Sequence, residues 1–180
     1  AARFGIPREE QDEFALRSHK LAAKATEEGI FAEEVVPAKV PPEFETVTED
    51  NVIRADSDME QLSKLKPAFT KPHGTLTAGN SSTFTDGASA AFITSEQKAK
   101  ELDIKPKAYI REYVYVAQDP DDELLLGPAY ATPNVLDKMG LNLDDIDVFE
   151  FHEAFAGQIL TVLKALNSDK FAKKNLNRDE

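Results

Sequence analysis

A helical pattern occupies the amino-terminal part of the chain. Pro7 is followed by the acidic run at residues 8–13, which is typical of a helix start because the positive end of the helix dipole favours acidic side chains. Small and apolar residues then recur at helical spacing: Phe14, Ser18, Leu21, Ala22 and Ala25. Gly29 is a natural stop. The pattern predicts an amphipathic helix with a small, alanine-rich inner face, and it leaves His19 on the polar side.

Loop-like sequence follows this helix. Residues 35–44 (VVPAKVPPEF) are punctuated by prolines, which predicts extended or loop structure. Residues 45–57 are polar and acidic, so we expect them to be exposed. Residues 59–65 predict a short helix that ends before Pro67.

From Gly74 onwards the pattern alternates between strand and helix. Three apolar or alternating runs predict strands: residues 88–94, 108–116 and 146–151. Three segments predict helices: residues 95–102 capped by Ser95, residues 132–140 with Thr132 as cap and Pro133 at the first position, and a stripe of Phe155, Ile159, Val162, Leu163 and Leu166. This order predicts an α/β sheet layered with helices. No further strand follows Leu166, so we expect an incomplete sheet. Either a partner chain completes it or the chain is truncated, and we favour truncation.

Composition narrows the class of protein. The chain has 180 residues and is 41% hydrophobic, which is enough for one domain or parts of two. A net charge of -12 disfavours nucleic acid and anionic membrane as partners, because both would be repelled. The opening AARFGIPREEQ has neither an initiator Met nor a signal-peptide pattern, so we expect an excised or mature piece. The absence of cysteine excludes disulfides, thiolate metal sites and a cysteine nucleophile within these residues.

Two stretches are candidates for chemistry. The run LTAGNSSTFTDGASA, residues 76–90, is rich in small and hydroxyl residues that allow close approach of a ligand to the backbone, or that form a tight polar loop packed on its own sheet. His152 and Glu153 lie where a predicted strand gives way to a helix. A neutral imidazole there can donate a hydrogen bond to a carbonyl oxygen that becomes negative during a reaction. The alternative is a helix cap or a buried hydrogen-bond partner.

Metal sites are not indicated. The acidic run at residues 119–123 lacks the alternating ligand spacing of a calcium loop, so a solvated turn is the favoured interpretation. His19 and His73 join no second histidine at metal-ligand spacing, and we expect both at the surface.

Longer stretches of the sequence resemble the thiolase family. The resemblance is carried by FGIPREEQDEFALRSHKLAAKA, KLKPAFTKPHGTLTAGNSSTFTDGASA, YVAQDPDDELLLGPAYATPNVL and DDIDVFEFHEAFAGQ, so it runs over nearly the whole chain. Most thiolases have Asn where this sequence has His152, and histidine there is typical of the β subunits of mitochondrial trifunctional enzymes, the long-chain 3-ketoacyl-CoA thiolases of fatty-acid oxidation. The resemblance implies a thiolase-like layered α/β fold, present in part: residues 1–73 as the end of the loop domain with a linker, and residues 74–180 as the first part of the C-terminal half.

The resemblance also implies a reaction. In the family, the thiol of coenzyme A cleaves a 3-ketoacyl-CoA into acetyl-CoA and a shortened acyl-CoA, with no permanently bound cofactor. A cysteine takes the acyl group, the histidine of a Gly-His-Pro motif activates it, and a second cysteine handles the proton at the acetyl carbon. None of these groups is expected in this chain, so we expect a thiolase fragment that is inactive alone. An acetyl-CoA acetyltransferase fragment and a non-catalytic module for acyl-CoA binding or assembly are the alternatives.

Site residues follow from the same resemblance. His152 matches the position that helps to form the oxyanion hole, and we expect Glu153 to be a structural neighbour. The matches to coenzyme A contacts are Ser82 at the pantetheine arm, Arg54 at the adenine-nucleotide end, Leu65 and Phe69 along the tunnel, and Ala154 and Phe155 beside it. The resemblance further implies a thiolase homodimer, an α subunit as partner, and a mitochondrial location in the matrix with inner-membrane association.

Overall fold

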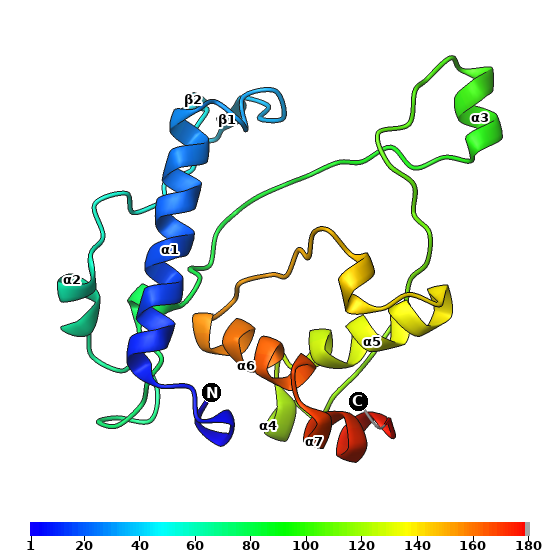
Figure 1. Ribbon diagram of the computed structural model, residues 1–180. Coiled ribbons are helices and arrows are strands. Elements are labelled where there is room, and N and C mark those ends of the chain that lie inside the picture. Colours follow the sequence, from blue (N-terminus) through cyan, green and yellow to red (C-terminus); the bar gives the residue numbers. More distant parts are fainter. Residues whose placement is uncertain (179–180) are drawn as a thin grey trace. The chain divides into compact units, whose positions relative to one another are not determined.

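The computed structural model describes residues 1–178 (Figure 1). The chain forms two compact units. The first unit contains Ala1–Thr83 and His152–Lys164. The second unit contains Phe84–Phe151 and the described residues from Ala165 onwards. None of the helices within residues 1–178 is long and apolar enough to cross a membrane.

The first unit is built around one long helix, α1 (Arg8–Glu27), which packs against α2 (Met59–Ser63) and a 3₁₀ turn at Ala78–Asn80. Pro7 precedes α1, and Glu9 and Glu10 lie in its first turn, so the predicted helix start is confirmed. The predicted short helix before Pro67 is confirmed as α2, and the side chain of Asp58 caps it by accepting a hydrogen bond from the Gln61 N–H at 2.7 Å.

The buried face of α1 differs from the prediction. Gln11 and Asp12 are 0% and 1% exposed, and Ala15 is also buried, whereas Leu21 is 50% exposed. The predicted inner face is therefore confirmed in part: Phe14, Ser18, Ala22 and Ala25 are half-buried, whereas the fully buried positions were not predicted. Polar residues occupy the inside because the neighbouring segments offer them hydrogen-bond partners, and a buried polar group with partners is tolerated.

Helix α6 (Ala156–Leu166), which belongs to the first unit up to Lys164, approaches α1 through a glycine. A Cβ atom placed on Gly157 would lie 2.7 Å from Oε1 of Gln11 and 3.2 Å from Cβ of Ala1. The Gln11 side chain is held by hydrogen bonds from its Nε2 to the carbonyls of Ile6 (3.1 Å) and Pro7 (3.2 Å). The absence of a side chain at Gly157 thus leaves room for the Gln11 side chain.

We expect Gly157→Ala to lower the free energy of unfolding by about 1–3 kcal/mol, because overpacking at this contact exceeds the gain in helix propensity of about 1 kcal/mol. Urea denaturation followed by circular dichroism measures the change. Gly87→Ala is the matched control, because nothing lies within 4 Å of a Cβ atom at that glycine. Equal midpoints for the two variants would contradict close packing at Gly157.

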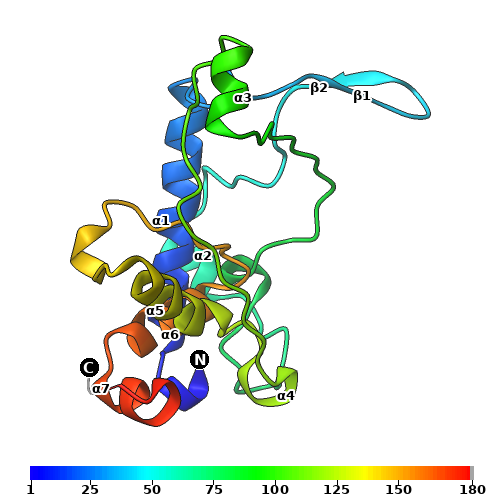
Figure 2. The ribbon, with the colours of Figure 1, turned by 90° about the vertical axis from the view of Figure 1, so that its right-hand side faces the viewer.

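The described residues contain a single two-stranded antiparallel sheet, β1 (Ala38–Val40) and β2 (Glu45–Val47), with Ala38 opposite Val47 and Val40 opposite Glu45. Figure 2 shows this hairpin beyond the carboxyl end of α1. The prediction of extended structure for residues 35–44 is confirmed at β1, and the predicted exposure of residues 45–57 holds for most of that segment. Strand β2 was not predicted, because acidic residues interrupt its short apolar alternation.

The regular elements of the second unit are all helical among its described residues, and long irregular segments connect them. Its elements are α3 (Glu96–Glu101), α4 (Pro120–Glu123), α5 (Gly127–Met139), a 3₁₀ turn (Leu143–Asp145), α7 (Asp169–Phe171) and a π-helical segment (Ala172–Leu176). The rings of Tyr130 and Phe171 meet edge to face at 5.3 Å between centroids, which packs α7 against α5. The chain after Leu166 is therefore partly helical.

Predicted helix boundaries in the second unit are confirmed in part. Ser95 caps α3 through its side chain, which accepts from the Lys98 N–H at 3.2 Å, as predicted. Helix α5 ends at Gly140, whose φ of 64° is left-handed, also as predicted. Its predicted start at Thr132 is wrong, because α5 begins at Gly127 with Pro128 in the first turn, and Pro133 lies inside the helix.

The three predicted strands are absent from the described structure. Residues 88–94, 108–116 and 146–151 form no ladder, and Figure 1 draws the chain on both sides of α3 as extended segments without arrows. Their apolar residues are exposed, including Phe92 at 80% and Tyr115 at 92%. A strand exists only where a neighbour satisfies its N–H and C=O groups, and no such neighbour lies beside these segments among residues 1–178.

Candidate functional site

Two stretches singled out in the sequence lie side by side in the first unit. The N–H of Ser82 donates to the carbonyl of Ala154 at 2.9 Å, and Ser81 pairs with Phe155 in an isolated antiparallel bridge. These contacts join the polar loop after Leu76 to the segment that begins at His152. Residues on either side of Phe84–Phe151 in the sequence therefore meet at one place.

A cavity of about 250 Å³ opens beside this junction. Its wall is formed by α1, the segment after β2, the 3₁₀ turn and the start of α6. The lining residues are Phe14, Ala15, Ser18, His19, Val52, Gly79, Asn80, Ser81, Ser82, His152, Glu153 and Ala156. Of the predicted site residues, Ser82 and His152 line the cavity.

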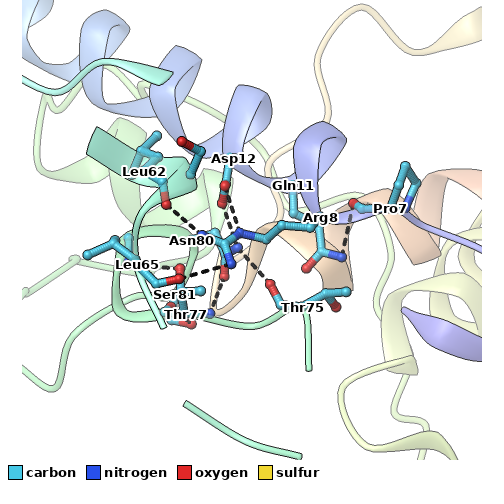
Figure 3. A network of polar contacts seen from close by, with 12 residues as sticks. Pro7, Arg8, Gln11, Asp12, Leu62, Leu65, Thr75, Thr77, Asn80 and Ser81 are labelled. Atoms are coloured by element: carbon cyan, nitrogen blue, oxygen red, sulfur yellow. Dashed lines mark hydrogen bonds and ion pairs between the residues drawn. The ribbon is translucent and has the colours of Figure 1, made fainter. Parts of the chain in front are cut away.

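A buried polar network fixes the loop that carries Ser82 (Figure 3). Asp12 accepts a hydrogen bond from Nδ2 of Asn80 at 2.8 Å and one from Nε of Arg8 at 2.6 Å. The Arg8 guanidinium also donates to the carbonyls of Leu62 at 2.5 Å and Leu65 at 3.2 Å. Asp12 therefore binds the Ser82 loop directly. It also orients Arg8, which forms hydrogen bonds to Leu62 and Leu65 at the end of α2.

The Ser82 loop is also closed by its own side chains. The Thr77 N–H donates to Oδ1 of Asn80 at 2.8 Å, and the Gly79 N–H donates to the Thr77 hydroxyl at 3.2 Å, which together form a capping box. A Cβ atom on Gly79 would lie 2.5 Å from methyl carbons of both Leu62 and Leu65. This small residue serves packing, so the interpretation as a tight polar loop is supported here. The loop packs on α1 and α2 rather than on a sheet.

The histidine and glutamate that open the second stretch are both exposed. Because His152 is exposed, the interpretation as a buried hydrogen-bond partner is wrong. Helix α6 begins only at Ala156, so His152 lies before the first turn and does not cap it directly. Oε2 of Glu153 accepts a hydrogen bond from the Ser18 hydroxyl at 2.5 Å, which links this stretch to α1 and agrees with a structural role.

His19 is a cavity residue that the sequence analysis placed at the surface. It is half-buried, and its Nδ1 accepts a hydrogen bond from the Arg54 N–H at 3.3 Å. Burial lowers the pKa of His19 from its ordinary value, the positive charge of Arg54 lowers it further, and Glu153 acts in the opposite direction. No local signal marks this position, because Arg54 and Glu153, which create the environment of His19, lie far along the sequence.

The other predicted contact residues do not line the cavity. Arg54 is exposed, and its guanidinium donates to the Asn51 carbonyl at 2.8 Å. Leu65 lies against the cavity residue Gly79, whereas Phe69 is 58% exposed and does not line the cavity. Ala154 and Phe155 are half-buried and make the junction with the Ser82 loop through their backbones.

Metal-ligand geometry is not found in the part of the chain that the structure describes, where no group of at least three His, Asp or Glu side chains is placed to hold an ion. The acidic run at residues 119–123 forms α4, and the Asp119 carboxylate caps it by accepting from the Asp121 N–H at 2.9 Å. The predicted solvated turn is confirmed, because Asp119, Asp121 and Asp122 are exposed, and the turn is a single capped turn of helix.

Two family models match the chain: the thiolase N-terminal domain over residues 1–97 and the thiolase C-terminal domain over residues 104–178. The mitochondrial trifunctional enzyme subunit beta of Bos taurus is 62% identical over 178 residues, which are 99% of this chain and 37% of that protein.

Solved structures agree in fold. The acetyl-CoA acetyltransferase of Bacillus anthracis matches 98% of this chain and 45% of its own, with a TM-score of 0.86 and 43% identity. Human mitochondrial 3-ketoacyl-CoA thiolase in complex with CoA matches 99% of this chain and 44% of its own, with a TM-score of 0.85 and 39% identity. These matches confirm the predicted thiolase-like α/β fold class.

The chain thus spans less than half the length of each of these proteins. The matches still run across almost all of the chain itself, through both family models and through both stretches that meet at the cavity. The chain belongs to the thiolase family.

Proposed function

We propose that this chain is part of a 3-ketoacyl-CoA thiolase, an acetyl-CoA C-acyltransferase of fatty-acid β-oxidation. In the family's reaction the active cysteine attacks the 3-keto carbon, the bond between the second and third carbons breaks, and acetyl-CoA leaves once its acetyl carbon is protonated. The thiol of coenzyme A then takes the acyl group from the cysteine, which releases the shortened acyl-CoA and restores the thiol. One observation carries the proposal: the loop with Ser82 and the stretch with His152, both matched to thiolase positions, line a single cavity. The 62% identity to a trifunctional enzyme subunit beta supports the same conclusion.

The role of His152 is to stabilise negative charge. An exposed imidazole on the cavity wall can donate an N–H hydrogen bond to the thioester oxygen, directly or through water, as charge develops on that oxygen. In this proposal the imidazole does not act as a general acid or base. Glu153, whose carboxylate accepts from Ser18, acts as a structural neighbour.

Coenzyme A is the proposed ligand of the surrounding residues. The Ser82 hydroxyl, which is exposed at the cavity, contacts the pantetheine arm, and Arg54 meets the adenine-nucleotide end. Leu65, Phe69, Ala154 and Phe155 supply the apolar wall of the tunnel. In the same proposal residues 1–73 end the loop domain and residues 74–180 begin the C-terminal half, and coenzyme A is a substrate rather than a resident cofactor.

Partners and location belong to the same proposal. A mitochondrial location, assembly with an α subunit, a thiolase homodimer and contact with the inner membrane fit a trifunctional enzyme subunit beta. A second candidate is an acetyl-CoA acetyltransferase, favoured by the 43% identity to the Bacillus anthracis protein. Preference for long-chain 3-ketoacyl-CoA over acetoacetyl-CoA in the complete gene product would separate the two.

A paired assay tests the function. We expect the 180-residue chain to show no thiolysis of acetoacetyl-CoA, because it has no cysteine to form the acyl intermediate. The product of the complete reading frame that contains this sequence is expected to cleave 3-ketoacyl-CoA, measured as loss of the substrate's ultraviolet absorbance. Turnover by the 180-residue chain above a no-protein control would contradict its inactivity, and an inactive complete product would contradict the function.

A further inference from the structure

The segment that carries Arg54 is irregular, and α1 holds it at two consecutive helix positions. Nδ1 of His19 accepts from the Arg54 N–H at 3.3 Å, and Nζ of Lys20 donates to the Ala55 carbonyl at 2.5 Å. Val52, from the same segment, lines the cavity together with His19. The segment is thereby fastened at the edge of the cavity by one backbone donor and one backbone acceptor.

The first of these bonds depends on the protonation state of an imidazole. Nδ1 can accept the Arg54 N–H only when its lone pair is free, so His19 must be neutral with its proton on Nε2. An imidazolium carries protons on both nitrogens and would turn a donor toward the Arg54 N–H. The Lys20 ammonium donates to the Ala55 carbonyl in its ordinary charged form, so this second bond does not depend on the protonation of His19.

The surroundings of His19 favour the neutral form. Arg54 faces it from the segment after β2, Glu153 faces it from the stretch before α6, and His152 lines the same cavity. Burial and the Arg54 charge lower the pKa of His19, and the attraction of Glu153 only offsets part of this. Glu153 is in turn engaged by the Ser18 hydroxyl.

We propose that His19 is a positioning residue that holds Arg54 at the edge of the cavity through its neutral Nδ1. The inference rests on the proposed function, in which Arg54 meets the adenine-nucleotide end of coenzyme A. His19 itself touches neither the reacting atoms nor the proposed ligand in this role.

A pH dependence follows from the lowered pKa. A group that binds its proton less readily in the folded chain contributes stability that is fully present above its ordinary pKa of 6.5. That contribution is lost as the pH falls through the window just below 6.5. The Arg54 segment is therefore held at neutral pH and released under mildly acidic conditions.

Hydrogen exchange of the Arg54 amide, measured by NMR on the full 180-residue chain, tests the bond itself. We expect its protection factor at about pH 7.5 to fall about five- to tenfold in His19→Ala, the loss of one hydrogen bond. His19→Asn places an amide oxygen where Nδ1 lies and cannot titrate, so it should keep the protection at about pH 7.5 and also at about pH 5.5. The wild-type chain should lose protection as the pH is lowered below 6.5 and His19 becomes protonated.

His73→Ala is the matched control, since His73 is exposed and lies outside the cavity lining. Unchanged Arg54 protection in His19→Ala, or a pH dependence that persists in His19→Asn, would overturn the proposal. Calorimetry with coenzyme A tests the proposed ligand separately from the hydrogen bond between His19 and Arg54. Loss of coenzyme A affinity in His19→Ala and not in His73→Ala supports the positioning role. If the exchange pattern is as expected but coenzyme A produces no heat of binding, the His19 hydrogen bond is confirmed. The assignment of coenzyme A as the ligand is then contradicted.

Discussion

Asp12→Ala is expected to lower the free energy of unfolding by about 3 kcal/mol, because it removes the shared acceptor of a buried network. Asp12 is 1% exposed and accepts from both Arg8 and Asn80. Without it, the guanidinium of Arg8 and the amide of Asn80 each lose a partner inside the protein. Arg8 keeps some contact with water, since its side chain is 23% exposed, which places the loss at the lower end for a broken buried pair.

Urea denaturation followed by far-ultraviolet circular dichroism measures this loss. Glu13→Ala is the matched control, because Glu13 is the next residue of α1 and is exposed, so its change should stay within about 0.5 kcal/mol. Asp12→Asn keeps an acceptor for Asn80 and removes the charge that faces Arg8, so it should fall between the two. Equal stability of Asp12→Ala and Glu13→Ala would show that the network does not hold the first unit together.

Elements fixed by local chemistry could be predicted from the sequence. Pro7 with the acidic first turn gave the start of α1, Ser95 gave the cap of α3, and Gly140 gave the end of α5. Each of these signals acts within one helical turn. Where two local signals competed, as Pro128 and Pro133 did for the start of α5, the wrong one was chosen.

Elements that depend on distant partners could not be predicted. Alternation in residues 108–116 indicates a strand, but a ladder requires a second strand that the described chain does not place beside it. The most deeply buried polar positions of α1 were missed for a related reason. Gln11 and Asp12 look like surface residues until Asn80 and the Ile6 carbonyl supply their partners.

The candidate site contains residues that local sequence could identify and one that it could not. Ser82 and His152 were singled out from local stretches, and both line the cavity. His19 was assigned to the surface, because its environment is created by Arg54 and Glu153, which lie 35 and 134 positions further along the sequence. Only the fold brings those three residues together.

His152→Ala, made in the product of the complete reading frame, is expected to lower kcat for thiolysis by about 10²–10³-fold, the loss typical of one oxyanion-hole donor. The effect should fall mainly on kcat, because the hydrogen bond strengthens as charge develops on the oxygen and contributes little to binding of the substrate. Steady-state kinetics with a 3-ketoacyl-CoA and coenzyme A measure both constants.

Two variants make this result specific to the donor at His152. His152→Asn offers an amide N–H in place of the imidazole, so it should retain activity within about tenfold of the unchanged protein. His73→Ala, at an exposed histidine outside the cavity lining, should change neither kcat nor KM. Rescue by Asn also separates the proposed role from proton transfer, because an amide side chain cannot act as a base at neutral pH. If His152→Asn were as slow as His152→Ala, the imidazole would have to do more than donate a hydrogen bond, and the oxyanion role would be contradicted.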